Sequence, residues 1–455
     1  MSHLLNKAQR LCRQIESLDP SGEALVVGGA VRDVLLGREC SDVDIAHNLS
    51  LPLIKEAFGA DGVGRGEEFG VTVVTFEDER FEVTCYRQES GYSDGKRPDT
   101  VTTTKDFKLD SARRDFTINS MGMHHDGKIE DPWGGQSDIK NRIVRCVGCS
   151  MDRFAEDPVR MLRAARFAAV LDFDLDGEAV AAARGFAIRL NDVAPDRITK
   201  EILKASQSGK SLAKFINHCD RMNLLPGFLP EVVALKGLPH APEHHPEGGV
   251  FEHTMAALNV SDSQIPEHNL AILLHDIGKA KTHETSPQGK PTYRGHEAVG
   301  AEMIPAIAER LHWPKHLTTL CEDVCREHMK GHILAEMSKP TRVALRLSEN
   351  WPAIKDAILA DSRCRMHLHD EQFVMEQMGK LDVEATKWGD QKELNKKLNS
   401  LASGHTIMQA IPGIAGQDIG KVKTATWDWL VGRSLNANPQ EVDAFIKDTY
   451  GGLPR

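Results

Sequence analysis

The sequence predicts an α+β fold, in which a small mixed sheet with helices at the N-terminus is followed by helical segments. Runs of apolar, β-branched residues occur in the first 150 or so residues. From about Glu156 the pattern turns helical and hardly returns to strand. The 455 residues are 40 % hydrophobic and 27 % charged, so the chain can bury several ordinary cores.

Four apolar runs predict the strands of the N-terminal part. They lie at residues 24–28, 42–46, 71–76 and 80–86. Short helices are expected between them, near residues 30–37 and 51–58. Residues 88–104 are rich in Gly, Ser, Thr, Asp and Pro, which predicts a mobile loop.

A Pro- and His-rich stretch at residues 237–249 marks a boundary within the helical part. Together with the change of pattern near Glu156 and a polar helical stretch with Gly- and Pro-containing turns after about residue 370, it divides the chain into an N-terminal domain and three helical segments. The predicted divisions are residues 1–150, 151–236, 237–370 and 371–455.

The composition restricts where the protein acts and what it binds. No run approaches the roughly 18 apolar residues of a membrane span, and the N-terminus lacks the apolar core of a secretory signal. Nine scattered cysteines argue against a disulfide framework, so we expect a cytoplasmic protein. The net charge of −10 argues against a nucleic-acid binder that is basic all over. Basic residues slightly outnumber acidic ones between Arg97 and Lys214, which is where a binding face is expected.

Two groups of cysteines have partial metal-ligand spacing. Cys146 and Cys149 form a lone CxxC, and Cys321 and Cys325 lie shortly before His328. Neither group has a partner cluster, so we interpret these cysteines as ordinary small buried residues.

Gly28 and Gly29 follow the first predicted strand and open a helix that carries Arg32. Glycines at such a turn let the backbone approach a phosphate closely, and the start of the helix offers unpaired N–H groups. Arg32 adds a forked donor for phosphate oxygens. A glycine pair at a strand–helix turn is more often structural, so this patch alone leaves both interpretations open.

Asp42 and Asp44 are two residues apart on a predicted strand, which places both carboxylates on one face. Two close carboxylates repel each other unless a cation lies between them, and Mg²⁺ prefers carboxylate oxygens together with substrate phosphates. Glu82, on a later strand, is a candidate third carboxylate, and two ions are expected to activate an attacking hydroxyl and stabilise a leaving pyrophosphate. The alternative is a solvated strand face.

A third patch combines arginines with carboxylates in two segments, and its members are Arg113, Arg114, Asp115, Asp157, Arg160, Arg163 and Arg166. Asp157 precedes a proline, which is also typical of a helix N-cap. On the helix that follows, Asp157 and Arg160 lie one turn apart, Arg163 lies on their flank, and Arg166 is expected to orient neighbours. A carboxylate beside a guanidinium matches the amino group and bare ring nitrogen of cytosine and adenine. Uracil and guanine present the reverse pattern and would leave both side chains mismatched.

These segments together resemble the class II, bacterial-type tRNA nucleotidyltransferases, or CCA-adding enzymes. The matching segments are LVVGGAVRDVLLGRECSDVDIA, FGVTVV, CYRQESGYSDGKRPDTV, SARRDFTINSM, DPWGGQSDIKNRIVRCVG and RFAEDPVRMLRAARFAA. The resemblance implies a head with a five-stranded nucleotidyltransferase sheet, followed by a helical neck, body and tail. Its substrates would be tRNA, CTP and ATP.

The resemblance also implies roles for particular residues. Asp42 and Asp44 would hold Mg²⁺, and Gly29 and Arg32 would contact the triphosphate. The remaining implied contacts are Arg114 and Asp115 with the nucleotide, and Asp157, Arg160, Arg163 and Arg166 with the base. The 88–104 segment resembles the family's flexible loop, associated with switching from CTP to ATP, which favours full CCA addition. The chain departs from the family pattern at His47, Val71 and Ser120, and none of these positions is a proposed ligand.

A second set of candidate metal ligands lies downstream, and it consists of His253, His275, Asp276, His296, His328 and Asp361. Imidazoles and carboxylates suit a transition metal or Mg²⁺ or Mn²⁺, and such a set can hold one or two ions with water left for hydrolysis. The run LLHDIGK resembles the HD-domain metal-dependent phosphohydrolases. That resemblance implies activity on phosphate esters such as 2′-phosphate or 2′,3′-cyclic phosphate ends of RNA. His332 competes with His328 for its role, and His283 is an outside candidate.

The leading hypothesis is template-independent addition of CCA to tRNA 3′ ends, with an accessory phosphohydrolase. A poly(A) polymerase of the same superfamily is the closest alternative. An RNA-binding protein with a vestigial transferase head and an active HD domain is a further one. A third possibility is that the predicted HD ligands bind a metal that only stabilises the structure.

Overall fold

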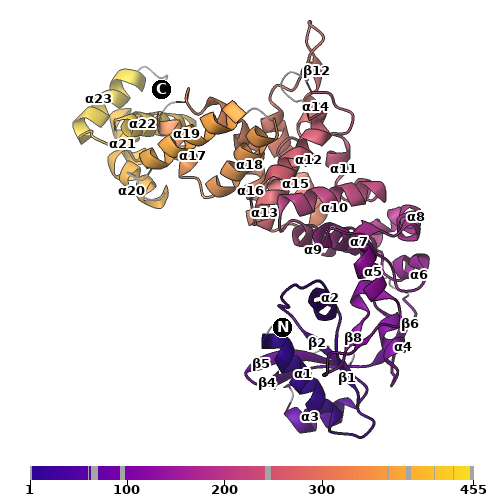
Figure 1. Cartoon of the computed structure of the whole chain (residues 1–455). Coiled ribbons are helices and arrows are strands. Elements are labelled where there is room, and N and C mark those ends of the chain that lie inside the picture. Colours follow the sequence, from indigo (N-terminus) through magenta and orange to yellow (C-terminus); the bar gives the residue numbers. More distant parts are fainter. Residues whose placement is uncertain are drawn as a thin grey trace. The chain divides into compact units, whose positions relative to one another are not determined.

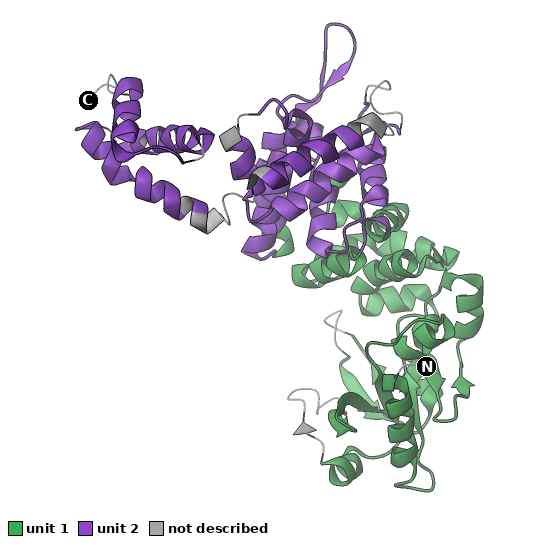
Figure 2. Ribbon diagram, turned by 60° about the vertical axis from the view of Figure 1, so that its left-hand side comes forward, with its two compact units in different colours: residues 1–207, 211–233, 310–312 green, residues 208–210, 234–309, 313–455 purple. Residues whose placement is uncertain are grey.

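A computed structural model describes residues 3–59, 61–62, 70–92, 98–240, 247–337, 339–365, 368–385, 391–414, 416–433 and 435–450. The chain forms two compact units (Figure 2). Unit 1 is Met1–Gln207 with Ser211–Val233 and Arg310–His312, and unit 2 is Ser208–Lys210 with Ala234–Glu309 and Trp313–Arg455. The predicted α+β class is confirmed, with the mixed sheet in unit 1. The finer division into four segments stays a prediction.

Unit 1 contains a seven-stranded sheet in the order β3-β4-β5-β2-β1-β8-β9. β2 runs parallel to β5, whereas the other neighbours are antiparallel, so the sheet is mixed. The five strands implied by resemblance are too few, because two-residue strands extend both edges. The strands are β1 (Ala24–Val27), β2 (Asp44–His47), β3 (Asp61–Gly62), β4 (Val71–Phe76), β5 (Glu79–Cys85), β8 (Gly122–Met123) and β9 (Ile129–Glu130).

Apolar residues alternate along β1, and each set faces a different core. Ala24 and Val26 pack with the fully buried Leu5 and Leu11 of α1. Leu25 and Val27 belong to a second cluster on the other side, together with Tyr86. Both faces of β1 are therefore covered by apolar residues, and Figure 1 shows α1 and α2 beside the sheet.

Residues 88–104 are not the simple loop that their composition predicts. β6 (Arg87–Ser90) and β7 (Thr100–Thr103) form an antiparallel hairpin, in which Glu89 pairs with Val101. β-branched residues in β7 favour the extended backbone, and cross-strand hydrogen bonds complete it. Residues 93–97 lie outside the described part, so the prediction of a mobile segment is not tested there.

Helices continue unit 1 after the sheet, as the change of pattern near Glu156 predicts. α6 begins at Ser150, six residues before the predicted change. α7 packs against α9, which brings the arginine-rich helix beside a second polar helix. The helices up to this boundary are α1 (His3–Glu16), α2 (Gly29–Leu35), α3 (Leu51–Phe58), α4 (Phe107–Ala112), α5 (Gly135–Asn141), α6 (Ser150–Glu156), α7 (Val159–Leu171), α8 (Gly177–Phe186), α9 (Pro195–Ala205), α10 (Gly209–Arg221) and α11 (Pro230–Val233). Short 3₁₀ turns and the paired strands β10 (Ile143–Val144) and β11 (Asp174–Leu175) connect them.

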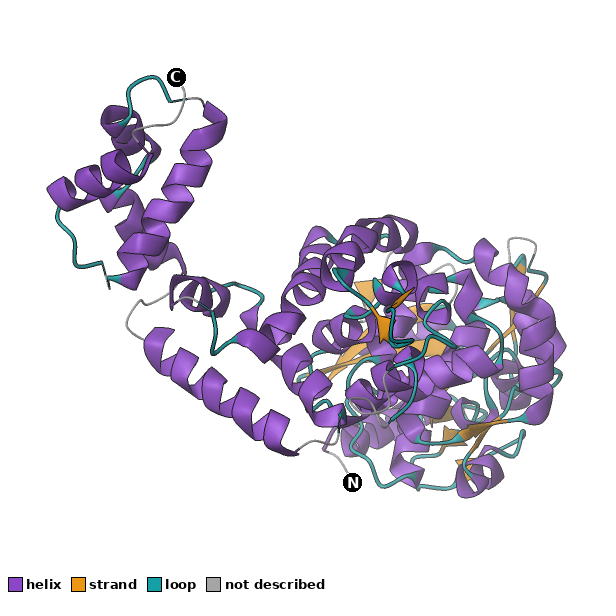
Figure 3. Ribbon diagram, turned by 90° about the horizontal axis from the view of Figure 1, so that it is seen from above, coloured by secondary structure: helices purple, strands orange, loops and turns teal. Residues whose placement is uncertain are grey.

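Unit 2 is helical apart from the hairpin of β12 (Glu284–Thr285) and β13 (Pro291–Thr292). Figure 3 shows how strongly helices predominate over strands in the chain. Its helices are α12 (Val250–Val260), α13 (Pro266–Leu274), α14 (Lys279–Thr282), α15 (His296–Leu311), α16 (Lys315–Glu327), the 3₁₀ turn η5 (His328–Ile333), α17 (Lys339–Arg346), α18 (Trp351–Cys364), α19 (Leu368–Ala385), α20 (Gln391–Leu401), α21 (Gly404–Ala410), α22 (Gly416–Gly432) and α23 (Pro439–Tyr450). α12, α13, α16 and α18 pack together, and α17 with α20–α23 forms a separate apolar core. No helix in the described ranges is long and apolar enough to cross a bilayer.

His47 occupies a fully buried position at the end of β2. Its Nδ1 accepts a hydrogen bond from Leu49 N at 3.2 Å, and burial lowers the pKa of the imidazole to about 4. Because the unfolded chain protonates this ring at a higher pH than the folded chain does, acid favours unfolding. The loss begins as the pH falls below the ordinary value of 6.5 and continues to about 4. Over this range the free energy of unfolding falls by about 3 kcal/mol.

We therefore expect His47→Thr to reduce the loss of stability between pH 6.5 and pH 4. A threonine hydroxyl can accept from the amide two residues on, so the backbone bond to Leu49 is retained. Urea unfolding of both proteins at several pH values measures this. If the free energy of unfolding fell equally with pH in the wild type and in His47→Thr over this range, the prediction would be contradicted.

Candidate active sites

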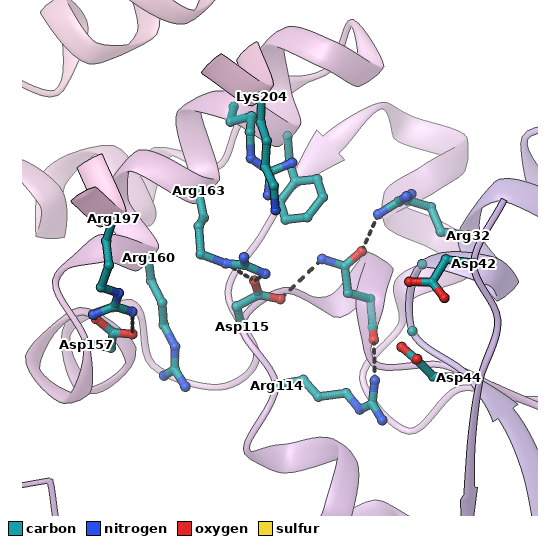
Figure 4. Close-up of a pocket in the computed structure, with 15 residues that line it drawn as sticks. Arg32, Asp42, Asp44, Arg114, Asp115, Asp157, Arg160, Arg163, Arg197 and Lys204 are labelled. Carbon is teal, nitrogen blue, oxygen red and sulfur yellow. Dashed lines mark hydrogen bonds and ion pairs between the residues drawn. The ribbon is translucent and has the colours of Figure 1, made fainter. Parts of the chain in front are cut away.

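A pocket of about 630 Å³ in unit 1 collects most of the predicted site residues. Its walls come from the β1–α2 turn, the start of β2, the segment after α4, and helices α7 and α9 (Figure 4). Cationic side chains outnumber carboxylates in the lining, which favours an anionic ligand. The lining residues are Gly28, Gly29, Arg32, Asp42, Asp44, Arg114, Asp115, Asn119, Asp157, Arg160, Arg163, Arg166, Phe167, Arg197 and Lys204.

Gly28 forms the corner between β1 and α2. It has a φ of +75°, a conformation that L side chains rarely adopt. A Cβ there would lie 3.1 Å from Nη1 of Arg114 and 3.9 Å from Oδ2 of Asp44. The glycine corner and the Asp44 carboxylate are therefore neighbours, as two adjacent strands require when Val27 pairs with Asp44.

Asp42 lies in the irregular segment before β2, so the prediction that both aspartates belong to the strand is wrong. Both nevertheless line the pocket. Burial, followed by repulsion from Asp42 and Glu82, raises the pKa of Asp44 to about 6, against the attraction of Arg114. Glu82 is on β5, which pairs with β2, and is absent from the pocket lining. Closely spaced carboxylate oxygens that repel one another are a donor set that fits a hard cation such as Mg²⁺.

The arginines near the acidic pair differ in their surroundings. Arg32 donates to Asn119 Oδ1 at 2.6 Å and to both oxygens of Asp33. Arg114 points into the pocket and contacts the Asn119 carbonyl at 3.4 Å. Arg113, predicted as a nucleotide contact, does not line the pocket, because its guanidinium pairs with Asp110 at 3.1 Å.

Asp115 is held by an arginine from α7. Nε and Nη2 of Arg163 donate to its Oδ2 at 2.8 and 2.6 Å. Burial alone would raise the pKa of Asp115, but Arg163 and the Asn119 amide lower it below its ordinary value. The carboxylate therefore remains ionised and fixes Arg163 in the pocket wall.

Asp157 precedes α7 and Arg160 lies in its first turn. Asp157 Oδ1 accepts from Val159 N at 3.2 Å and so satisfies the first amide of α7, although the N-cap position itself is Pro158. Its carboxylate also pairs with Arg197 of α9. Arg160 donates to Glu156 Oε2 at 2.5 Å. Arg166 donates to Glu201 of α9 at 2.5 Å, and the orienting role expected for it stays a prediction.

Sequence reasoning missed several side chains of the pocket. Phe167 has the guanidinium groups of three arginines around its ring, those of Arg32, Arg163 and Arg166 at 5.3, 5.5 and 4.1 Å. α9 contributes further polar residues at i, i+4 and i+7, a spacing that indicates one helix face. They are Arg197 and Lys204, which line the pocket, and Glu201, which does not line it and pairs with Arg166. That periodicity is visible in the sequence, but nothing in it shows that this face meets α7.

The second predicted site lies in unit 2, and all six of its predicted residues are buried. His275 and Asp276 follow α13, and the others come from α12, the start of α15, η5 and α18. The Nδ1 atoms of three rings donate to backbone carbonyls. His275 bonds Ile272 at 2.7 Å, and His296 and His328 bond Tyr293 and Cys325, each at 2.8 Å. Such bonds fix the tautomer and leave Nε2 directed at the centre.

Asp276 lies between two pairs of these histidines. Its Oδ2 is 3.2 Å from Nε2 of His275 and 3.7 Å from that of His253. Its Oδ1 is 3.2 Å from Nε2 of His296 and 3.6 Å from that of His328. Asp361 completes the first group at 3.0 Å from His253 Nε2. Imidazole nitrogens converging on the two oxygens of one carboxylate fit two divalent cations that share it.

The competing candidates lie outside this centre. His332 contacts Asp361 at 2.9 Å and is partly exposed, whereas His328 is buried and faces Asp276, so the structure favours His328. Burial also lowers the pKa of His328, which favours the neutral ring that binds a cation. His283 is exposed and packs against Tyr293 in a tilted arrangement. Among the predicted small buried cysteines, Cys149 is the exception, being exposed.

Family models match both parts of the chain. A poly A polymerase head domain matches residues 24–145, and an HD domain matches residues 250–366. The chain is 30 % identical over 403 residues to a multifunctional CCA protein of Acinetobacter baumannii, covering 85 % of this chain and 95 % of that protein. It is 35 % identical over 354 residues to the multifunctional CCA protein of Halorhodospira halophila, covering 74 % and 83 %.

Solved structures show the same fold. The CCA-adding enzyme of Bacillus stearothermophilus in complex with CTP superposes with a TM-score of 0.67 at 22 % identity, covering 99 % of this chain and 98 % of that one. The Thermotoga maritima CCA-adding enzyme complexed with tRNA gives a TM-score of 0.56 at 16 % identity, covering 99 % and 96 %. With the acidic pair beside its glycine corner and the buried histidine centre both present, the chain belongs to the family of multifunctional CCA proteins.

Proposed function

We propose that this protein adds CCA to tRNA 3′ ends without a template, using CTP and ATP. The observation that carries the proposal is the unit 1 pocket, which joins three chemically different parts. It contains the acidic pair, the glycine corner with Arg32, and the Asp157–Arg160 region. A nucleoside triphosphate needs these parts for metal, phosphate and base respectively. The relatives named as CCA proteins and the neighbour solved with CTP support the same function.

In the proposed mechanism, Asp42 and Asp44 hold Mg²⁺, with Glu82 as a neighbouring carboxylate. The ion supplies charge neutralisation at the reacting phosphate and a lower pKa for the terminal 3′-hydroxyl of the RNA. Arg32 and the glycine corner bind the triphosphate and receive the pyrophosphate that leaves. Arg114, beside Asp44, faces the same phosphates.

Asp157 and Arg160 select the base in this proposal. The carboxylate accepts from the exocyclic amino group, and the guanidinium donates to the unprotonated ring nitrogen. Cytosine and adenine satisfy both side chains, whereas uracil and guanine satisfy neither. Arg163 and Asp115 form the wall of the pocket and keep this geometry rigid. The RNA is held mainly through its phosphates.

We further propose that unit 2 hydrolyses phosphate esters of RNA ends, such as 2′-phosphates or 2′,3′-cyclic phosphates. Divalent cations held by the histidines, Asp276 and Asp361 would supply Lewis-acid polarisation and a nucleophilic water. Lys279, with its Nζ 2.6 Å from Asp276, and Arg365, 2.7 Å from Asp361, add positive charge beside the centre. Positive charge there favours an anionic ester.

Sequencing of tRNA 3′ ends tests the transferase proposal. A tRNA that lacks its last three nucleotides is incubated with the protein and all four nucleoside triphosphates. We expect ends that stop at CCA, with at least about tenfold less U or G at each position. Long A tails formed with ATP alone would identify a poly(A) polymerase instead. Because the proposed substrate is tRNA, we also propose that the protein acts in the cytoplasm.

A further inference from the structure

The proposed base-reading residues carry opposite charges in one pocket, yet they form no ion pair with each other within the described residues. Asp157 and Arg160 are separated by one turn, a spacing at which such pairs commonly form. If they paired directly, each would satisfy the other and no hydrogen-bonding edge would be left for a base. Something must hold them apart.

Each of the two has its own partner outside the pair. Arg160 donates to Glu156 at 2.5 Å and to the Arg113 carbonyl at 3.1 Å. Asp157 is bound by both Nη atoms of Arg197, at 3.1 and 2.6 Å. Arg197 comes from α9, so this contact joins two helices, and its fork fixes the plane of the carboxylate.

The contacts of Asp157 also determine which acceptor position remains. Oδ1 accepts from Val159 N and from Nη1 of Arg197, and Oδ2 accepts from Nη2. A carboxylate offers about four acceptor positions, so about one is left, on Oδ2. Cytosine and adenine each present one exocyclic amino group, which can donate to this remaining position on Oδ2.

α9 is itself held in place against α7. Ile198 and Ile202 are buried, and Glu201 pairs with Arg166 at 2.5 Å. Arg197 therefore projects from a packed helix, and its side chain is only 24 % exposed. An arginine in such surroundings can set the position of Asp157 more sharply than a surface side chain can.

We propose that Arg197 is a positioning residue for base selection, holding Asp157 away from Arg160 and directing its Oδ2 at the base. This inference rests on the proposed transferase function. Without Arg197, the Asp157 carboxylate turns toward Arg160 and forms an ion pair with it. Neither side chain is then available to hydrogen-bond the base, so the preference for cytosine and adenine falls.

Arg197→Gln and Arg197→Lys test this in the full-length chain, with Lys200→Gln as the control. Lys200 is exposed on the same helix and does not line the pocket. Single-turnover incorporation of CTP and UTP into a tRNA that lacks its 3′ CCA gives the discrimination ratio, and thermal unfolding reports on folding. We expect R197Q to lower the CTP:UTP ratio by about tenfold or more. R197K, which keeps the charge but not the fork, should lower it less, and K200Q should not change it.

A folded R197Q that slows both nucleotides equally, with the ratio unchanged, would make the role merely structural and overturn the inference. If R197Q does not fold, R197K decides, since a wild-type ratio in R197K would overturn the inference as well. A wild-type chain that incorporates neither CTP nor ATP would overturn the proposed function itself. An R197Q variant that is active and keeps the wild-type CTP:UTP ratio would overturn only the role of Arg197, so the two failures can be told apart.

Discussion

Asp44→Asn is expected to abolish nucleotide incorporation while leaving the phosphohydrolase activity proposed for unit 2 intact. The substitution keeps the shape of the side chain and removes one of the closely spaced charges that we propose hold Mg²⁺. Losing several kcal/mol of charge stabilisation slows the reaction by about a thousandfold. Since repulsion from Asp42 and Glu82 also disappears, the fold should not be weakened.

Incorporation of labelled CTP measures the transferase effect, and Asp78→Asn is the matched control. Asp78 is exposed in the β4–β5 turn with a φ of +65°, which asparagine tolerates. We expect D78N to incorporate CTP at the wild-type rate. Substantial incorporation by a folded D44N would contradict the placement of the reaction at this acidic pair.

Asp276→Asn is expected to remove the hydrolytic activity proposed for unit 2 and at least one of the cations proposed to bind there. Asp276 offers one oxygen to each pair of histidines, so an amide, whose nitrogen cannot bind a cation, breaks the shared ligand. We expect wild-type protein to retain about two divalent ions in this centre and D276N at most about one. Phosphate release from a 2′-phosphorylated RNA should fall by about a thousandfold.

Metal content measured after loading with Mn²⁺ separates binding from activity. Asp262→Asn is the control, because Asp262 is 84 % exposed and pairs only at the surface with Arg363. CTP incorporation by D276N should match that of the wild type. Unchanged metal content in D276N would contradict a shared carboxylate, and full metal content without any hydrolysis in the wild type would favour a structural role.

The sequence predicts local structure best where one signal dominates. The apolar runs at 24–28 and 71–76 became β1 and β4 because their β-branched residues bury well on a pleated sheet. It misplaced Asp42, since a strand boundary depends on which backbone groups find a partner, and pairing with β1 begins at Asp44. It also missed the β6–β7 hairpin, whose polar strands are stabilised by cross-strand hydrogen bonds rather than by burial.

The sequence by itself determined which chemical groups are present. The aspartates near the glycine corner and the His275-Asp276 pair are recognisable because their spacing along the chain brings them together locally. Which arginine serves which carboxylate was decided only by the tertiary structure. Arg197 and Asp157 are 40 residues apart, and their meeting depends on how α7 packs against α9. Attraction between opposite charges does not depend on their positions in the sequence. Which arginine pairs with which carboxylate therefore depends on how the apolar faces of the helices pack and bring the two side chains close together.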